Sequence, residues 1–222
     1  MRTVPLFQLP VVLFPGALLP LHIFEPRYRA MLSDCVEGDH LFGVVPGNTD
    51  SDRPALGAVG CIARVRAVQP LPDGRSNIVV SGEDRFQVRR IVPSEKAYLI
   101  GEIDDLADLP DVQVPRPDEL ASLRTLGVRY AEALATLNDV ERDPEFSDEP
   151  GMMTFQIASL LEWELPVKQH FLAIRSATER VARLLHALPS LLGSLEARAQ
   201  VHRRASLNGK GGSPPPMTDA LS

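Results

Sequence analysis

Cysteine is scarce in this sequence of 222 residues, which has only Cys35 and Cys61. The two lie 26 residues apart, without C-x-x-C spacing or a histidine cluster beside them. This arrangement predicts neither a zinc site nor a disulfide framework. Aromatic residues are also few, at 5% of the chain, and the formal net charge is -6. An acidic balance argues against a protein that holds nucleic acid mainly by neutralising phosphates.

Long apolar runs are missing as well. The first 24 residues are rich in apolar side chains, but Pro5, Pro10, Pro15 and Pro20 interrupt them at every fifth position. The helical core of a signal peptide cannot form through these prolines. No other window approaches the ~18 uninterrupted apolar residues of a transmembrane helix. We therefore predict a cytoplasmic protein that has no membrane partner.

The sequence signatures of common enzymes are absent too. G-x-S-x-G and H-E-x-x-H do not occur. The glycines around Lys210 lack the G-x-x-x-x-G-K-[ST] spacing of a phosphate-binding loop. The histidines are scattered over five separate segments, as His22, His40, His170, His186 and His202. We predict no catalytic residue, no metal site and no cofactor.

Acidic residues gather near the middle of the chain. Residues 1–100 hold 11 basic and 10 acidic side chains, whereas residues 101–150 hold 4 and 14. The acids Asp104, Asp105, Asp108 and Asp111 lack the alternating series and closing glutamate of an EF-hand. We interpret them as a solvated hinge between two structurally different halves.

The first half has the period of β-strands. In residues 61–67, small or apolar side chains alternate with Arg64 and Arg66, which is typical of a half-buried strand. Strands are also predicted at residues 3–8, 41–46, 78–81, 86–91 and 97–104, in a mostly antiparallel sheet. One short helix is expected from Pro26 to a stop at Gly38, with Cys35 on its buried face.

The second half has the period of helices. From Pro117, apolar residues recur at steps of three and four up to residue 137. A second helix is predicted to begin at Asp148 and Pro150 and to end at Pro166, followed by a third over residues 167–174. Ser176 has capping-box spacing for a fourth helix, which Pro189 should kink or divide. The prediction is an α+β protein: a β-rich subdomain over residues 1–108, a helical bundle over 109–205 and a disordered tail over 206–222.

The stretch LPVVLFPGALLPLHIFEPRYRAML at residues 9–32 contains F-P-G followed by P-L-x-I-F-E-P-R-Y. It closely resembles the opening of the Lon substrate-binding domain, the N-terminal region of ATP-dependent Lon proteases, which also occurs as a free-standing bacterial protein. Three later blocks resemble the same family in the same order. They comprise Gly57 with residues 60–64; Pro72, Asp73 and Gly74 with Val80, Gly82, Arg85 and Phe86; and Pro166, Lys168 and Gln169. The resemblance spans roughly residues 4–188.

The resemblance implies a PUA-like pseudo-barrel followed by a helical subdomain, and a role in recognising other polypeptides. It also implies a non-enzymatic chain, because the AAA+ module and Ser-Lys protease domain of a Lon protease need several hundred further residues. The expected partners are unfolded or client proteins, and a separate protease or chaperone is a further candidate. Weak candidates for polypeptide contact are Phe7, Phe42 and Trp163, at the sheet face and at the junction of sheet and bundle.

The motif residues themselves are predicted to serve the architecture rather than binding. Leu21, Ile23, Phe24 and Tyr28 are expected in the core. Glu25 and Arg27 are expected to pair across the start of the helix. The other motif residues placed in this structural class are Pro15, Gly16 and Pro20, with Gly57 and Gly82 serving backbone geometry.

Other functions stay open at this point. The arginines of the sheet (Arg64, Arg66, Arg85, Arg89 and Arg90) form either a solvated face or the phosphate-contacting surface of a PUA-like RNA-binding protein. A hydrolase whose catalytic residues meet only in three dimensions is another alternative. A scaffold subunit that dimerises through its helical bundle is a further one.

Overall fold

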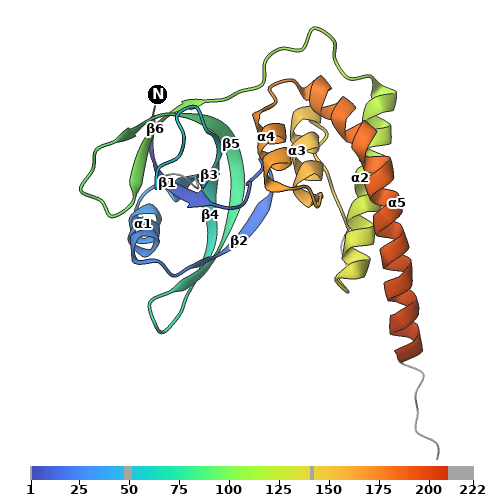
Figure 1. Ribbon diagram of the computed structural model, residues 1–222, viewed down its shortest axis with the longest axis horizontal. Helices are drawn as coiled ribbons and strands as arrows, with labels where there is room; N and C mark the ends of the chain where they lie inside the picture. Colours follow the sequence, from blue (N-terminus) through green and yellow to red (C-terminus); the bar gives the residue numbers. More distant parts are fainter. Residues whose placement is uncertain (1, 48–51, 141–142, 210–222) are drawn as a thin grey trace, which may run out of the picture.

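The computed structural model describes residues 2–47, 52–140 and 143–209. A six-stranded sheet with one helix forms one part, and four helices lie beside it as the other part (Figure 1). This arrangement confirms the predicted α+β class. None of the helices in the described ranges combines the length and apolar composition that crossing a bilayer requires. The division of the chain at residue 108 stays a prediction.

The sheet closes on itself. Its strands are β1 (Arg2–Leu9), β2 (Leu18–Ile23), β3 (Leu41–Pro46), β4 (Val59–Pro70), β5 (Ser76–Val92) and β6 (Leu99–Asp105). They are ordered β2-β5-β4-β3-β1-β6, and an additional β5–β6 pairing joins the ends. Only the β1–β3 pair is parallel. Five strands therefore make a barrel, and β2 lies outside the closed ring on the edge of β5.

Two strand predictions were wrong. Residues 78–81 and 86–91 belong to one strand, β5, which is 17 residues long and pairs with β2, β4 and β6. At Gly82 this strand passes so close to another segment that an added Cβ would lie 2.1 Å from the carbonyl oxygen of Phe14. β2 was not predicted, because Pro20 cannot donate to a ladder and weakens the strand signal. It is an edge strand, where proline is tolerated.

Helix α1 (Pro26–Glu37) covers one side of the barrel, and it begins and ends as predicted. Its buried residues are Tyr28, Met31, Leu32 and Cys35. The Cys35 thiol donates to the carbonyl of Leu41 at 3.2 Å. Burial raises the pKa of Cys35 to about 12, so the thiol is a small packed group and not a nucleophile.

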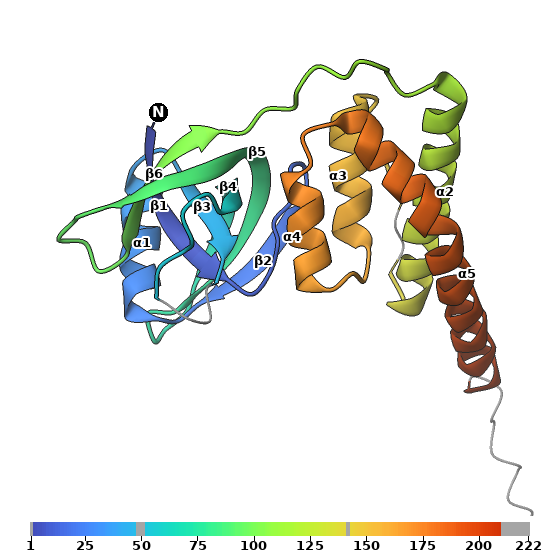
Figure 2. The ribbon, with the colours of Figure 1, turned by 45° about the horizontal axis from the view of Figure 1, so that its top comes forward.

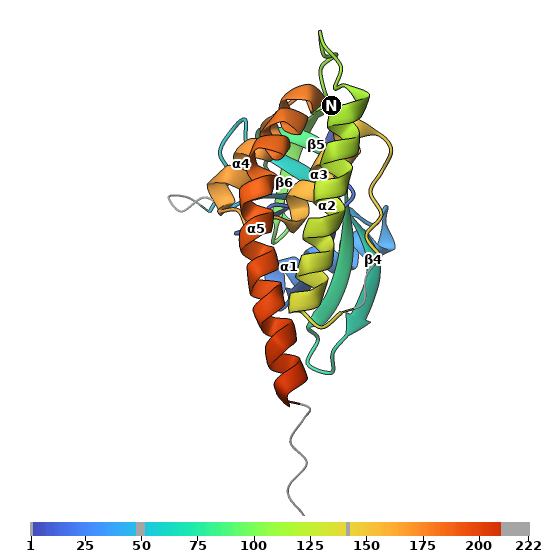
Figure 3. The same ribbon diagram turned by 90° about the vertical axis from the view of Figure 1, so that its right-hand side faces the viewer.

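The other part consists of α2 (Pro117–Leu137), α3 (Pro150–Leu160), α4 (Leu165–Ala173) and α5 (Ala177–Gly209). The long helices α2 and α5 lie side by side (Figures 1 and 3). The short helices α3 and α4 lie between them and the barrel (Figure 2). The core that joins the four helices includes Leu123, Tyr130, Ile157 and Leu184.

Several helix boundaries differ from the prediction. Glu149, rather than Asp148, caps α3 through bonds from the N–H groups of Gly151 and Met152. α3 ends at Leu160, and Pro166 lies in the first turn of α4 instead of terminating α3. Pro189 does not divide α5, which is continuous from Ala177 to Gly209. Helix α5 thus continues four residues into the predicted tail, and the rest of the tail, residues 210–222, lies outside the described residues.

Candidate functional site

The segment between β1 and β2 ties the barrel to the helices. Phe14, in the middle of this segment, is fully buried, with its ring centroid 6.1 Å from that of Phe155 and 6.2 Å from that of Phe171. Two backbone bonds hold the segment to β5: Gly82 donates to Ala17 at 2.8 Å, and Gly16 donates to Gly82 at 2.9 Å. Gly16 adopts φ +74°, in the left-handed region that favours glycine. The positive φ of Gly16 and the close approach at Gly82 are consistent with the backbone roles expected for these two glycines.

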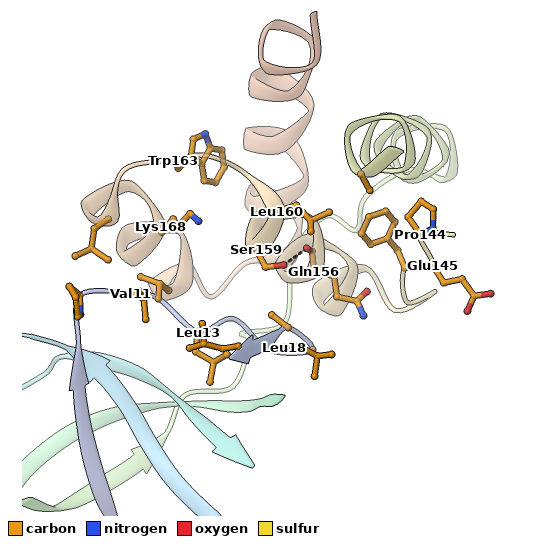
Figure 4. A pocket seen from close by; sticks show the side chains of 18 residues that line it. Val11, Leu13, Leu18, Pro144, Glu145, Gln156, Ser159, Leu160, Trp163 and Lys168 are labelled. Atoms are coloured by element: carbon orange, nitrogen blue, oxygen red, sulfur yellow. Dashed lines mark hydrogen bonds between the residues drawn. The ribbon is translucent and has the colours of Figure 1, made fainter. Parts of the chain in front are cut away.

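An apolar cleft opens beside this segment, where the barrel meets the helices (Figure 4). We call it the junction cleft. Its volume is about 710 Å³. From the barrel side it is lined by residues 10–13 and 16–19, and from the helical side by Ala131, Pro144, Glu145, Phe146, Gln156, Ser159, Leu160, Trp163, Leu165 and Lys168.

Large apolar side chains are partly uncovered in the junction cleft. Leu18, the first residue of β2, has a large apolar side chain and is nevertheless 69% exposed. Trp163 is half-buried, with its ring centroid 5.3 Å from that of Phe171. Of the three predicted contact residues, Trp163 is the one that lines this cleft.

Lys168 is the basic residue of the lining. Across the described part of the chain, its ammonium has no hydrogen bond or ion pair. Burial lowers the pKa of Lys168, and the charge of Glu162 opposes part of that shift. The neighbouring Gln169 is structural, since its Nε2 donates to the carbonyl of Val59 at 2.7 Å and fixes α4 to β4.

Two buried arginines and a partly exposed aspartate form a cluster at the other end of α3. Asp108 accepts from Arg180 Nη1 at 2.8 Å and Nη2 at 2.6 Å, and it also pairs with Arg85. Arg85 Nη1 donates to the carbonyls of Leu172 and Ile174, both at 2.7 Å. We call Arg85, Asp108 and Arg180 the arginine lock.

Phe155 completes the environment of the arginine lock. The guanidinium of Arg180 lies 4.1 Å from the centroid of its ring, and that of Arg85 lies 4.8 Å from it. Because Arg85 comes from β5, Asp108 from the segment after β6 and Arg180 from α5, this cluster joins the barrel to the helices. It cross-links the two parts around one carboxylate.

The arginine lock overturns one prediction from the sequence. Arg85 was placed on a solvated sheet face, but it is only 5% exposed. Asp108 was assigned to a solvated hinge; its side chain remains 33% exposed, and it also binds two guanidiniums. The other sheet arginines also have acidic or hydroxyl partners: Arg64 with Glu83, Arg66 with Ser81, Arg89 with Asp104 and Arg90 with Glu102. Their pairing weighs against a surface that is free to bind phosphates.

The predicted exposure of Phe7 and Phe42 was wrong. Phe7 is 5% exposed and Phe42 is fully buried, inside the core between the barrel and α1. The Phe7 ring centroid lies 4.0 Å from that of Tyr28. Neither ring is available to another chain while the protein is folded.

The motif residues around α1 are partly as predicted. Arg27 Nε donates to Glu25 at 3.0 Å, which confirms the pair at the helix start. Tyr28 and Ile23 are buried in the core, as expected. Phe24 is not, because it is 58% exposed and stacks on His22 with centroids 5.9 Å apart. Ile23 takes the inward position, and the next side chain turns outward.

Acidic residues do not form a metal site in the parts of the chain that the structure describes. The aspartates of the predicted hinge have separate partners instead. Asp104 pairs with Arg89, Asp105 with Arg2, and Asp111 accepts from both the N–H and the hydroxyl of Thr178 at 2.9 Å.

Comparison with known proteins relates this fold to one family. The sequence model described as "ATP-dependent protease La (LON) substrate-binding domain" matches residues 3–190. The chain is 25% identical over 203 residues to a Lon protease of Cytophaga hutchinsonii, covering 87% of this chain and 25% of that protein. It is 27% identical over 213 residues to a Lon protease of Parabacteroides distasonis, covering 91% and 25%. The chain thus spans about a quarter of the length of these curated relatives.

Two solved structures share the fold. A Lon N-terminal domain protein from Xanthomonas campestris superposes with a TM-score of 0.65 at 24% identity, covering 85% of this chain and 100% of that one. The N-terminal domain of Mycobacterium avium complex Lon protease superposes with a TM-score of 0.58 at 19% identity, covering 83% and 97%.

Proposed function

The chain belongs to the family of substrate-binding domains of the ATP-dependent protease La (LON), and from this membership we propose that it binds unfolded polypeptide segments without cutting them. The observation that carries the proposal is the junction cleft, which is lined mainly by apolar residues and exposes Leu18 to solvent. An exposed apolar surface of this kind is typical of protein interaction sites.

The size of the junction cleft suits a segment of chain rather than a folded domain. Its volume of about 710 Å³ lies within the 300–1,000 Å³ typical of ligand pockets. This space accommodates a few apolar side chains, and an unfolded protein exposes such side chains on an accessible backbone. A folded protein presents them far less often.

The edge of β2 adds a second means of binding. Among the described strands, β2 pairs only with β5. Its other edge is therefore available to an extended chain, which can add to a sheet through backbone hydrogen bonds. Because Leu18 and Leu19 of β2 also line the junction cleft, backbone pairing and side-chain burial are available side by side.

The non-enzymatic part of the proposal concerns the matched residues themselves. Residues 3–190 match the substrate-binding family, and the chain covers about a quarter of each protease. We propose that cutting, where it follows binding, is done by a separate protease, and that a chaperone is the other candidate recipient. A homodimer formed through the helices stays a prediction.

A titration tests the binding. A reduced, carboxymethylated model protein should show saturable binding at tens of micromolar, and the folded form of the same protein should not. Leu18→Ser should weaken the binding, whereas Leu56→Ser, at a residue 72% exposed outside the cleft lining, should leave it unchanged. Equal affinity for the folded and unfolded forms would contradict the proposal.

Two further assays test the alternatives. Incubation of the purified protein with casein and ATP should give neither fragments nor phosphate. Single-stranded RNA should show no binding even at low ionic strength, where phosphate contacts are strongest.

A further inference from the structure

We propose that the junction cleft selects apolar segments that carry an acidic side chain, whose carboxylate binds the ammonium of Lys168. This inference rests on the proposed function and specifies the class of segment that is bound. It starts from the chemistry of the one basic group in a lining made mainly of apolar residues.

Lys168 is placed to receive an anion. It is half-buried in α4 and lines the cleft together with Trp163 and Leu165. Glu162, whose charge acts on Lys168, is already bound to Arg198 at 3.0 Å. In the described part of the chain, no carboxylate forms an ion pair with Lys168.

Partial burial makes the charged form of the Lys168 ammonium less stable than that of a lysine at the surface. Loss of water disfavours the charged form, which is why the pKa of Lys168 is lowered. A carboxylate that enters the cleft would replace part of the lost hydration and stabilise the charge. Coulombic attraction between them is stronger beside apolar groups than in bulk water.

The second charge of the lining, Glu145, favours an internal segment over a chain terminus. Figure 4 shows Lys168 near Trp163 and Val11 at one end of the view, and Glu145 at the other. An internal segment can place an acidic side chain at Lys168 and a basic one toward Glu145. A terminal carboxylate would complement only Lys168. The bound segment should therefore have opposite charges on the two sides of its apolar residues.

Labelled peptides test this directly by fluorescence anisotropy at low ionic strength. One peptide has four leucine or phenylalanine residues between a lysine and a glutamate, with blocked ends, and the second has glutamine in place of the glutamate. We expect the glutamate peptide to bind about five- to tenfold more tightly. A third peptide, with the glutamine and a free terminal carboxylate, shows whether the preference follows the chain end instead.

Variants assign the preference to one residue. Lys168→Met should abolish the preference for glutamate, so that the two peptides bind this variant with equal affinity. Lys168→Arg should keep it. Lys96→Met removes the same charge outside the cleft lining, from a lysine already bound to Asp34 at 2.8 Å, and should leave the preference intact.

The outcomes separate the two proposals. Binding of both peptides with equal affinity overturns the selection by Lys168 and leaves the proposed function standing. A preference that follows the terminal carboxylate also overturns it. Absence of binding by every peptide and by the unfolded protein overturns the proposed function itself. The glutamate and glutamine peptides are compared first on the wild-type protein. This comparison can contradict the inference even if a variant fails to fold.

Discussion

The two ends of α3 meet the barrel in opposite ways. At its N-terminal end, the arginine lock is polar, and its two buried guanidiniums bind the Asp108 carboxylate and backbone carbonyls. At its C-terminal end, the junction cleft is open and lined mainly by apolar residues, and its lysine has no ion pair among the described residues. The difference indicates that one end holds the two parts together while the other is left for a ligand. Substitutions at the two ends should therefore separate stability from binding.

The largest effect is expected at the arginine lock. Asp108→Ala leaves two buried guanidiniums without their shared carboxylate, and we expect the free energy of unfolding to fall by about 3–5 kcal/mol. Urea-induced unfolding followed by circular dichroism measures this loss. Asp105→Ala, three residues earlier at an exposed aspartate 3.5 Å from Arg2, should cost less than about 0.5 kcal/mol. Similar losses for the two variants would remove the distinction between the lock and an ordinary surface pair.

The next effect concerns the segment that passes between the two ends. In Gly82→Ala, the new methyl group would lie 2.1 Å from the Phe14 carbonyl oxygen, which is backbone and can yield only if the segment shifts. We expect a loss of about 2–3 kcal/mol. Gly193→Ala is the matched control, because nothing lies within 4 Å of its added Cβ. This control should stabilise α5 by about 0.5–1 kcal/mol. Thermal melting of both variants shows whether each substitution raises or lowers the melting temperature.

The cleft end should respond in affinity and not in stability. Leu18→Ser removes a leucine that is 69% exposed, so the free energy of unfolding should change by less than about 0.5 kcal/mol. The affinity for an unfolded protein should fall about three- to fivefold because apolar contact area is lost. Calorimetric titration and urea unfolding of the same preparation measure both quantities. A loss of stability without a loss of affinity would reverse the assignment of the two ends.

The smallest effect is expected at Lys168. Because its pKa is lowered in the fold, the charged form is disfavoured there, and Lys168→Met should raise stability by less than about 1 kcal/mol. Lys96→Met should instead lower it slightly, by breaking the ion pair with Asp34.

The pH dependence follows from the same shift at Lys168. The unfavourable contribution of its ammonium is fully present below the lowered pKa. It is relieved as the pH rises through that value toward the ordinary 10.5. Over this range the wild type should gain stability relative to Lys168→Met, which lacks the group. Parallel stability curves for the two proteins would argue against a buried ammonium.

Local patterns in the sequence account for most of the fold. The starts of helices at Pro26, Pro117 and Pro150 were predictable from local sequence. Proline fixes its own φ near the helical value, and the N–H that it lacks has no partner in the first turn of a helix. The strand β5 was divided wrongly because a glycine within a strand usually signals a break. A glycine is needed at position 82 because the carbonyl of Phe14, which belongs to a distant segment, leaves no room for a Cβ there.

The site was less predictable than the fold. Arg85 and Asp108 are 23 residues apart, and Asp108 and Arg180 are 72 apart. Composition correctly marks them as charged, but it carries no information on burial, which depends on how the helices pack on the barrel. The same limitation explains Phe7 and Phe42, since an aromatic residue in a strand fits either face. Trp163 was predicted inside a helix, whereas it lies between α3 and α4, where it lines the junction cleft.

The pairing of β1 has a consequence for the order in which the chain folds during its synthesis. Leu6 of β1 faces Leu99 of β6 across the ladder, so the barrel cannot close until that strand has left the ribosome. At about 5–20 residues per second, this takes roughly 5 to 20 seconds after β1 emerges. Arg85 must wait longer still, until Leu172 and Arg180 have been translated. The nascent barrel is thus exposed to aggregation throughout this interval, and its charged cross-link is among the last contacts to form.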